Sequence, residues 1–532
     1  IPIMQTDLKL LNKHSLYELL SSRFSHVEKK LSDIPSPTKL QDSTKAAKRI
    51  ADAIRNNEKI TLVGDYDVDG VSSTAIVVDF FRQIPYPLEA IIPNRFTDGY
   101  GVSPNVLQRI EADVVFTVDN GITAIAAGEV CKEKGIDLII TDHHTASDVL
   151  PDAYAIVDPK LESCPYPFKE ICGAQVAWMF MGLIKKELDL SIDMKQFLDI
   201  LAIAIIADIM PLVDINRTLV KEGLKVLMTS PRPSSVIIRD YLNKASITSE
   251  DIAFQIAPRI NSAGRLEDAS IALDFFIATN INTAYNQFEL LGKLNDLRKE
   301  TEAQCTQEAM ILADSTADVI VVAKENWHEG VVGIVAARLV DKFAKPAIVL
   351  SLKGGVAKGS ARSIGDVSIY ELIKSCEHLL TKFGGHKMAA GLGLNQESIE
   401  NFTQAINSSA AKLDPKDFEP KEALTGILST HDIDLELLDL LEQFEPYGEA
   451  NLRPTFLIKD AEVVSIKLMG QDKSHSRIEI RQSPHEQKTL ELIAFRTVYE
   501  MPQTRKITCS YTVTKNEFNN RVSAQLLVNK IH

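Results

Sequence analysis

Three short apolar segments in the first third of the chain each run directly into acidic or histidine residues. The polar groups that follow them are DYDVDG at 65–70, DNG at 119–121 and DHH at 142–144. Amphipathic segments long enough for crossover helices lie between them, and this alternation predicts a doubly wound parallel sheet. Because ligand sites in such sheets lie at the carboxyl ends of the strands, we expect the three groups to meet at one edge.

A fourth carboxylate, Asp208, follows the continuously apolar segment 200–207, which is predicted to be buried. An ionised carboxylate there is costly unless it is paired or binds metal. Oxygen ligands combined with imidazole suit Mn²⁺ or Mg²⁺ better than thiolate-bound zinc. The predicted metal ligands are Asp65, Asp67, Asp69, Asp119, His143 and Asp208. Such a set can hold two divalent cations roughly 3.5–4 Å apart, which clamp a phosphodiester and generate a hydroxide nucleophile.

Each of these motifs also has a simpler interpretation. The sequence DYDVDG resembles the opening of an EF-hand calcium loop, but the twelfth position is Ile76 rather than Glu and a strand-like segment precedes it. Asp119-Asn120-Gly121 alone is typical of an ordinary turn. The recurrence of polar groups after successive strands is therefore the observation on which the metal-site prediction depends.

Eight motifs carry a resemblance to a known family. Four of them, in this order, resemble the DHH phosphoesterase superfamily: DYDVDG (65–70), VDNG (118–121), TDHH (141–144) and ADIMPL (207–212). Four more are similar to those of the RecJ single-strand-specific DNA exonucleases: APRINSAGRL (257–266), WHEGVVGIVAARL (327–339), GSARS (359–363) and FGGHKMAAG (383–391). The resemblance spans roughly residues 45 to 532, nearly the whole chain.

The resemblance implies a metal-dependent exodeoxyribonuclease specific for single-stranded DNA. Such an enzyme hydrolyses phosphodiester bonds in the 5′→3′ direction by a two-metal mechanism and releases 5′-mononucleotides. It acts in DNA repair, including mismatch repair, and in recombination. The implied partners are single-stranded DNA, a RecQ-type helicase and single-strand-binding protein. We expect the protein to be a monomer.

Roles within the metal site are assigned as hypotheses. One ion is expected to bind Asp67 and Asp119. The second ion is expected to bind Asp69, Asp119, His143 and Asp208, so that Asp119 bridges the two. Asp65 is a further ligand, and His144 contacts the substrate phosphate or orients a ligand. Arg362 or His144 is expected to stabilise the negative charge added to the phosphate during the reaction.

The second half of the chain offers groups for binding phosphate and DNA. Glycines beside polar donors allow backbone N–H groups to approach a phosphate closely, although either glycine segment alone is more often a structural turn. The resemblance implies that the phosphate of the terminal nucleotide is bound by Ser360, Arg362, Gly384, Gly385 and His386. It implies that the strand is guided by Arg259, Asn261 and Arg265. His328 is expected to face the same cleft, and Trp327 to pack in the core.

The 532 residues are expected to form an α/β multidomain protein. The expected parts are an N-terminal extension (1–45), the doubly wound DHH metal-binding catalytic domain (46–282), a long connecting helix (283–316), a second α/β, DHH-associated substrate-binding domain (317–413) and an OB-like nucleic-acid-binding domain (421–532). Short alternating segments predict a small β-barrel in the last part. Residues 451–532 carry 13 Lys and Arg against 8 Asp and Glu, whereas the whole chain has a net charge of −14. The basic excess of the barrel suits a nucleic-acid surface.

Composition places the chain in a broad class. Six cysteines without a C-x-x-C pair indicate a reducing compartment. No apolar stretch approaches the roughly 20 residues of a membrane span, and no signal sequence is recognisable, so we expect a soluble, cytoplasmic protein. Because the first residue is Ile rather than Met, the true N-terminus is expected to be missing or trimmed.

Two other functions stay open at this point. A phosphoesterase of the same superfamily that acts on short oligonucleotides or small nucleotide phosphates would share the metal motifs, but its relatives usually lack APRINSAGRL and a basic β-rich tail. A non-catalytic replication scaffold would be expected to have lost metal ligands, and a pure single-strand-binding protein would explain the basic tail but not the carboxylates. Divalent-dependent release of nucleotides distinguishes an enzyme from a binding protein or scaffold.

Overall fold

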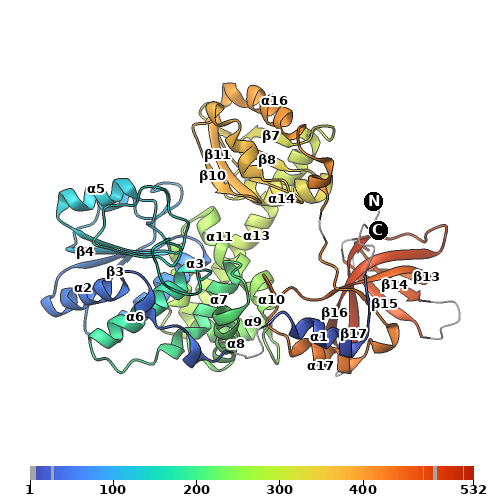
Figure 1. Cartoon of the computed structure of the whole chain (residues 1–532), viewed down its shortest axis with the longest axis horizontal. Helices are drawn as coiled ribbons and strands as arrows, with labels where there is room; N and C mark the ends of the chain where they lie inside the picture. The colour runs from blue at the N-terminus through green and yellow to red at the C-terminus, as the bar shows by residue number, and fades with distance from the viewer. Residues whose placement is uncertain are drawn as a thin grey trace.

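A computed structural model describes residues 8–24, 29–420, 422–470, 473–482, 488–495, 497–518 and 521–532. It forms two α/β domains and a C-terminal β-barrel, with one long helix running between the α/β domains (Figure 1). The predicted architecture is therefore confirmed. No helix among the described residues is long and apolar enough to cross a membrane.

The first domain contains a five-stranded, fully parallel sheet. Its strands in spatial order are β3 (Glu89–Ile91), β2 (Ile60–Val63), β4 (Val114–Val118), β5 (Asp137–Thr141) and β6 (Ala155–Val157). Figure 1 shows α5 (Ile125–Lys134) on one face, and α2 (Ser43–Asn56) and α6 (Gly173–Glu187) on the other. The strand order reverses between β2 and β4, and crevices at such reversal points are where parallel sheets bind ligands.

A helical layer completes this domain. Its helices are α3 (Val68–Phe81), α7 (Leu198–Ala207), α8 (Asp214–Thr229), α9 (Pro233–Leu242), α10 (Ser249–Asp251), η4 (Ile252–Ile256), α11 (Ala257–Leu266) and α12 (Ser270–Phe276). The short helix α4 (Pro104–Leu107) contacts α5 instead. The apolar segment 200–207 forms most of α7, and its residues 200–206 are buried as predicted. Because α7 packs against both α3 and α8, a helix apolar on every side is stable there.

The predicted long helix is α13 (Ile281–Leu312), which contacts α9 and α12 in the first domain and α14 (Val332–Phe343) in the second. The second sheet is mixed, with the order β10 (Lys382–His386), β11 (Ala389–Asn395), β9 (Val356–Arg362), β8 (Ala347–Lys353) and β7 (Ile320–Glu325). One face packs on α14 and the other on α15 (Ile369–Lys374) and α16 (Ile399–Ala410). Trp327 is buried in the α14 layer, which confirms the core interpretation.

The C-terminal part is a closed five-stranded barrel. Its order is β13 (Thr455–Met469), β14 (His475–Arg481), β15 (Leu490–Ala494), β17 (Arg521–Ile531) and β16 (Lys506–Phe518). The small β-barrel predicted from the short alternating segments is therefore confirmed. The N-terminal segment joins this domain, because β1 (Leu10–Leu11) pairs with β12 (Ile427–Leu428) and α1 (Lys13–Ser21) packs against α17 (Leu435–Glu442).

Candidate active site

The loop after β2 turns its carboxylates toward the sheet edge. Asp67 caps the start of α3 by accepting a 3.1 Å hydrogen bond from the Gly70 N–H. Both carboxylate oxygens of Asp69 accept backbone hydrogen bonds, of 2.6 Å from Gly173 and 2.9 Å from Ala174. These two donors are the first residues of α6, so the positive end of a helix orients Asp69.

Asp119 follows β4 in a left-handed conformation, with φ of 61°. The side chain of Asn120 fixes this turn, because it donates to the carbonyls of Val63 and Val118 and accepts from the Val102 N–H. Gly173 packs directly on Asp119, and a Cβ at Gly173 would lie 2.5 Å from both the Cβ and Oδ1 of Asp119. The first residue of α6 must therefore be a glycine for this helix to start in contact with Asp119.

Asp142 organises the DHH loop. Its Oδ1 accepts hydrogen bonds from the backbone N–H groups of His143 (2.7 Å) and His144 (3.2 Å) and lies 2.7 Å from His144 Nδ1, and its Oδ2 accepts from the Ile122 N–H. Burial alone would lower the pKa of His144, but the Asp142 hydrogen bond and the surrounding carboxylates raise it to about 9. Asp142 therefore holds His144 as a cation at the site.

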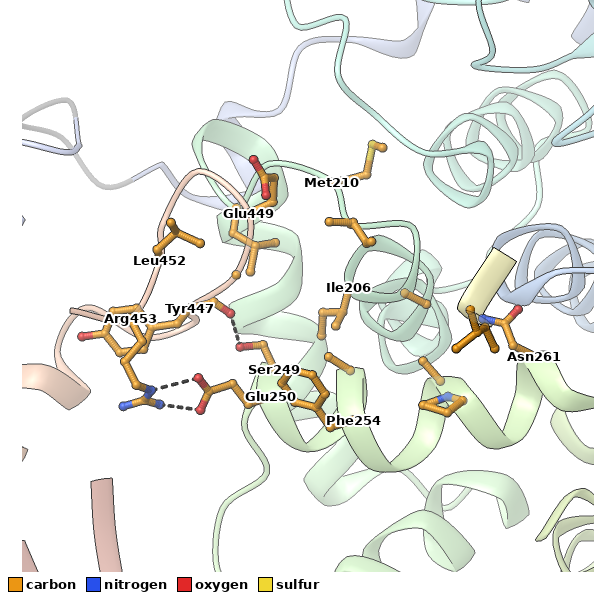
Figure 2. Close-up of a pocket in the computed structure, with 18 of the residues that line it drawn as sticks. Ile206, Met210, Ser249, Glu250, Phe254, Asn261, Tyr447, Glu449, Leu452 and Arg453 are labelled. Atoms are coloured by element: carbon orange, nitrogen blue, oxygen red, sulfur yellow. Dashed lines mark hydrogen bonds and ion pairs between the residues drawn. The ribbon is translucent and has the colours of Figure 1, made fainter. Parts of the chain in front are cut away.

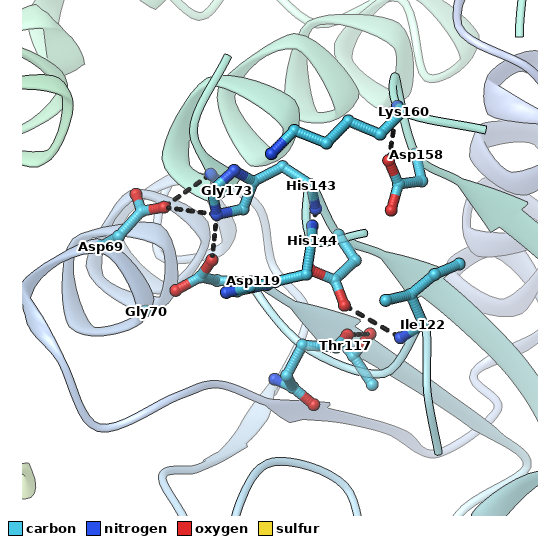
Figure 3. Close-up of polar contacts among 12 residues, drawn as sticks. Asp69, Gly70, Thr117, Asp119, Ile122, His143, His144, Asp158, Lys160 and Gly173 are labelled. Atoms are coloured by element: carbon cyan, nitrogen blue, oxygen red, sulfur yellow. Dashed lines mark hydrogen bonds and ion pairs between the residues drawn. The ribbon is translucent and has the colours of Figure 1, made fainter. Parts of the chain in front are cut away.

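The predicted ligands converge on His143 (Figure 3). Its Nε2 lies 3.1 Å from Asp119 Oδ1, 3.6 Å from Asp69 Oδ2 and 3.7 Å from Asp208 Oδ2. Three overlapping groups have ligand atoms within 4.8 Å of one another: Asp119, His143 and His144; Asp69, His143 and Asp208; Asp65, Asp67 and Asp119. All six predicted metal ligands and His144 thus lie in one cluster.

The electrostatics of this cluster favour the binding of cations. Burial and the charges of neighbouring carboxylates raise the pKa values of Asp65, Asp119 and Asp208 well above the ordinary range. Among the described residues no hydrogen bond reaches buried Asp65 Oδ1, Asp119 Oδ1, Asp208 Oδ2 or His143 Nδ1, and the contacts of His143 Nε2 with Asp119 and Asp208 are ion-pair contacts only. Buried oxygens without donors, together with imidazole, fit hard divalent cations such as Mn²⁺ and Mg²⁺.

Sequence reasoning missed Asp158, Lys160 and Tyr100. Asp158 follows β6 as the other acids follow β2, β4 and β5, so the same strand-end pattern carried the signal. Burial, followed by the charge of Asp142, raises the pKa of Asp158 to about 7. The Tyr100 ring stands 6.2 Å from that of His144, and its hydroxyl lies 3.5 Å from the Asp119 carbonyl.

The structure brings two of the predicted DNA-binding arginines together. Arg265, at the end of α11, donates to the Gly330 carbonyl of the second domain. Burial and then the charges of Arg95, Arg298 and Arg362 lower the pKa of Arg265, while Asp67 opposes them. We call Arg95, Arg265, Arg298 and Arg362 the arginine cluster, which lies beside the acidic site. Arg95 and Arg298 were not predicted.

Ser360 and Arg362 flank the first turn of α14. A Cβ at Gly333 would lie 2.9 Å from Arg362 Nη2 and 3.3 Å from Ser360 Oγ. Sheet pairing places Gly384 in the row of Ser360 and His386 in the row of Arg362, each across β11, with the Gly384–His386 segment exposed. Gly385, between them, has φ of 148°. Ser360, Arg362, Gly384 and His386 therefore lie on one face of the second sheet, and Gly385 alternates to the other.

The remaining predicted residues make different contacts. Asn261 Oδ1 accepts a 3.3 Å hydrogen bond from the Val68 N–H, so it supports the loop that carries Asp67 and Asp69. Arg259 stacks on Tyr241 and Phe288, 4.2 Å and 4.9 Å from their ring centroids, on a different face of α11 from Arg265. His328 Nδ1 accepts from the Gly330 N–H, and its ring contacts Phe96 beside Arg95.

A groove of about 490 Å³ extends from Asn261 and Arg265 toward the barrel domain (Figure 2). Its apolar lining includes Ile206, Met210, Phe254 and Leu452, and Phe254 is 78% exposed. The loop 445–453, which precedes the barrel, forms the far wall. This loop is held by the Arg453–Glu250 ion pair and by hydrogen bonds from Leu212 N to the Glu449 carbonyl and from Ser249 Oγ to the Tyr447 carbonyl.

Comparisons with known proteins agree with this arrangement. Three family models match the chain: the DHH family, N-terminal domain (residues 59–205), the DHHA1 domain (316–412) and the RecJ OB domain (425–530). The "Single-stranded-DNA-specific exonuclease RecJ" of Haemophilus influenzae is 31% identical over 538 residues, which cover 95% of this chain and 93% of that protein. The protein of the same name from Bacillus subtilis is 35% identical over 93% of this chain.

The chain spans 64% of the length of the Bacillus subtilis relative. Among solved structures, RecJ from Thermus thermophilus in complex with Mn²⁺ superposes with a TM-score of 0.83 and 27% identity, over 97% of this chain and 76% of that chain. The same relative in complex with Mg²⁺ gives a TM-score of 0.76 and 25% identity, over 97% of this chain and 74% of that chain.

Proposed function

We propose that this chain, which belongs to the RecJ family of single-strand-specific DNA exonucleases, removes 5′-mononucleotides from the 5′ end of single-stranded DNA by metal-dependent hydrolysis. The observation that carries the proposal is the position of the acidic cluster beside the arginine cluster. The acids come from the first domain and the arginines from both α/β domains. A site that holds cations beside a second site that holds a phosphate suits attack on a phosphodiester near a strand end.

Two divalent cations, Mn²⁺ or Mg²⁺, would be held by Asp65, Asp67, Asp69, Asp119, His143 and Asp208. When bound, they would supply Lewis-acid stabilisation of the phosphate and an activated water. The protein's own contribution is to hold the ligands rigidly: the start of α6 fixes Asp69, and Asn120 fixes the Asp119 turn. His144, kept protonated by Asp142, is a hydrogen-bond donor for the phosphate.

The arginine cluster would bind the 5′-terminal phosphate. Arg265 and Arg362 lie close enough for their charges to lower the pKa of Arg265, and such mutual repulsion is relieved when an anion binds between them. The N–H groups at the start of α14 and Ser360 add uncharged donors. Binding of the terminal phosphate at a fixed place would set the 5′→3′ polarity.

The groove beside the site would carry the rest of the strand. Its volume of about 490 Å³ is that of a small-molecule pocket, too small for a duplex segment, and its exposed Phe254 offers a surface for base stacking. The groove leads to the loop before the barrel, so the basic barrel is proposed to bind the strand further along. The domain limits expected from sequence fit these roles.

A cellular role follows as part of the proposal. A RecQ-type helicase would supply single strands, and single-strand-binding protein would share the substrate, during DNA repair and recombination. We propose that the protein acts as a monomer in the cytoplasm. Co-purification with a helicase from cell extract, and sedimentation of the purified protein, would test the partner and the oligomeric state.

The direct test uses an oligonucleotide labelled at its 5′ or 3′ end, with Mn²⁺, Mg²⁺ or a chelator. The intact protein is compared with Asp208→Asn, which keeps the side-chain shape, and with Asp152→Asn, an exposed carboxylate paired with Lys132. Immediate metal-dependent release of 5′-labelled mononucleotide, lost only in Asp208→Asn, would support the proposal. Long strands left intact while dinucleotides are hydrolysed would instead identify a small-substrate phosphoesterase.

A further inference from the structure

Lys160 lies on the loop that follows β6, at the sheet edge that carries the acidic cluster. Asp158 opens this loop, and its Oδ1 accepts a 2.7 Å hydrogen bond from the Lys160 backbone N–H. An aspartate that bonds the backbone two residues onward forms an Asx turn, which fixes the direction of the chain. Figure 3 shows the Lys160 side chain extended from this turn toward the imidazole of His143.

The Lys160 ammonium makes no hydrogen bond or ion pair with the described residues. Its backbone N–H makes the hydrogen bond to Asp158, but no described acceptor or carboxylate lies within bonding distance of Nζ. Asp158 is buried two residues away, and its Oδ2 likewise has no described hydrogen-bond partner. A lysine kept for structure would be expected to pair with such a carboxylate. Burial raises the pKa of Asp158 and the charge of Lys160 opposes that rise, yet the ammonium forms no ion pair with this carboxylate and extends toward the site.

The charge of Lys160 reaches the acidic cluster from the side of β6. The pKa of His143 is lowered by burial first and also by His144 and Lys160. Burial and the charges of Asp69 and Asp67 raise the pKa of Asp208, and the charges of His144 and Lys160 oppose that rise. The arginine cluster lies instead at the end of α11 and on the second domain. The acidic site therefore has cationic side chains on two sides.

We propose that Lys160 is a substrate-binding residue that contacts the phosphate undergoing hydrolysis. The inference rests on the proposed exonuclease function and extends it to a residue outside the metal-ligand set. The attacked phosphodiester carries one negative charge and gains a second as the nucleophile adds, so an unpaired ammonium facing it stabilises the transition state more than the ground state. The terminal phosphate, one nucleotide away, is left to the arginine cluster.

The test compares Lys160→Met, Lys160→Arg, Arg362→Ala and the control Lys132→Met, whose lysine is exposed and paired with Asp152. Each protein is assayed on strands with a 5′-phosphate and with a 5′-hydroxyl. We expect Lys160→Met to lower kcat by about 10- to 100-fold, the range for one charged hydrogen bond, and by the same factor on both strands. Lys160→Arg should recover part of the loss. Arg362→Ala should lower activity more on the strand with a 5′-phosphate than on the strand with a 5′-hydroxyl.

Three results would overturn the inference. One is a kcat for Lys160→Met equal to that of Lys132→Met, and another is a loss confined to the 5′-phosphorylated strand. The third is a loss that saturating Mn²⁺ restores, with a matching change in Mn²⁺ affinity measured by electron paramagnetic resonance, because Lys160 would then act on the ligands. If the unaltered protein releases no nucleotide, the proposed function fails and this inference falls with it.

Discussion

Replacing Gly173 by alanine tests whether the start of α6 sets the ligand geometry. The added methyl would lie 2.5 Å from Asp119 Cβ and Oδ1. Carbon atoms prefer separations of about 3.5 Å or more, so Asp119 or the helix must move by about 1 Å. Gly173 also donates the 2.6 Å hydrogen bond to Asp69, so the same shift disturbs a second ligand.

A displacement of about 1 Å at a catalytic group costs roughly 100-fold in rate, and overpacking costs about 1–3 kcal/mol of stability. We therefore expect Gly173→Ala to lower kcat for nucleotide release about 100-fold and to weaken Mn²⁺ binding. Gly182→Ala is the matched control, because it lies in the same helix and a Cβ there meets nothing within 4 Å. It should add about 0.5–1 kcal/mol of stability.

The assay is release of labelled mononucleotide at saturating Mn²⁺, together with Mn²⁺ titration by electron paramagnetic resonance. Circular dichroism at the assay temperature verifies that both variants are folded. A kcat for Gly173→Ala within threefold of that for Gly182→Ala would refute the reasoning. In that case the start of α6 would have shifted to accept the methyl group without displacing Asp119 or Asp69.

Three further predictions concern charge. Asp208→Asn should abolish turnover yet raise the unfolding temperature of the chelated protein at pH 8. Burial and the charges of Asp69 and Asp67 raise the folded pKa of Asp208, so stability falls as pH rises above the unfolded value. The gain should shrink at pH 5 or with Mn²⁺, and a lower unfolding temperature at pH 8 would contradict it. Burial raises the pKa of Asp158 from 3.8 to about 7, so Asp158→Asn should stabilise the chelated protein by at most about 4 kcal/mol at pH 8 and less at pH 5, measured by urea unfolding. An equal change in the free energy of unfolding at pH 8 and pH 5 would show that the raised pKa of Asp158 is not the cause. Arg265→Ala should weaken binding of single-stranded DNA and flatten the salt dependence of log Kd by about one unit, and an unchanged slope would remove Arg265 from the DNA path.

The barrel domain supports the active site through one loop. The loop 445–453 bonds to Leu212, four residues beyond Asp208, and to Glu250 and Ser249 at the start of the α10–α11 segment. That segment continues into Asn261, which supports the Asp67 loop, and Arg265. The two walls of the groove are thus fixed by the same loop that precedes the first barrel strand, β13.

The sequence by itself determined the acidic site. Parallel strands end at one edge, so polar residues placed directly after successive buried strands must meet there, whatever the loops between them do. Asp65, Asp119 and His143 could be assigned as metal ligands for that reason. Asp208 could be assigned because this carboxylate directly follows a long apolar segment. Asp158 follows the same rule and was missed because β6 is only three residues long.

Only the tertiary structure decided which polar residues face the site and which support it. Asp142 resembles a ligand in sequence but accepts hydrogen bonds from His143, His144 and Ile122, so it orients the loop. Arg259 and Arg265 belong to the same sequence motif. Arg259 stacks on aromatic rings, whereas Arg265 belongs to the arginine cluster. The N-terminal strand β1 pairs with β12, more than 400 residues away in the chain. Such contacts depend on packing between segments far apart in sequence, and no local periodicity encodes which segments will meet.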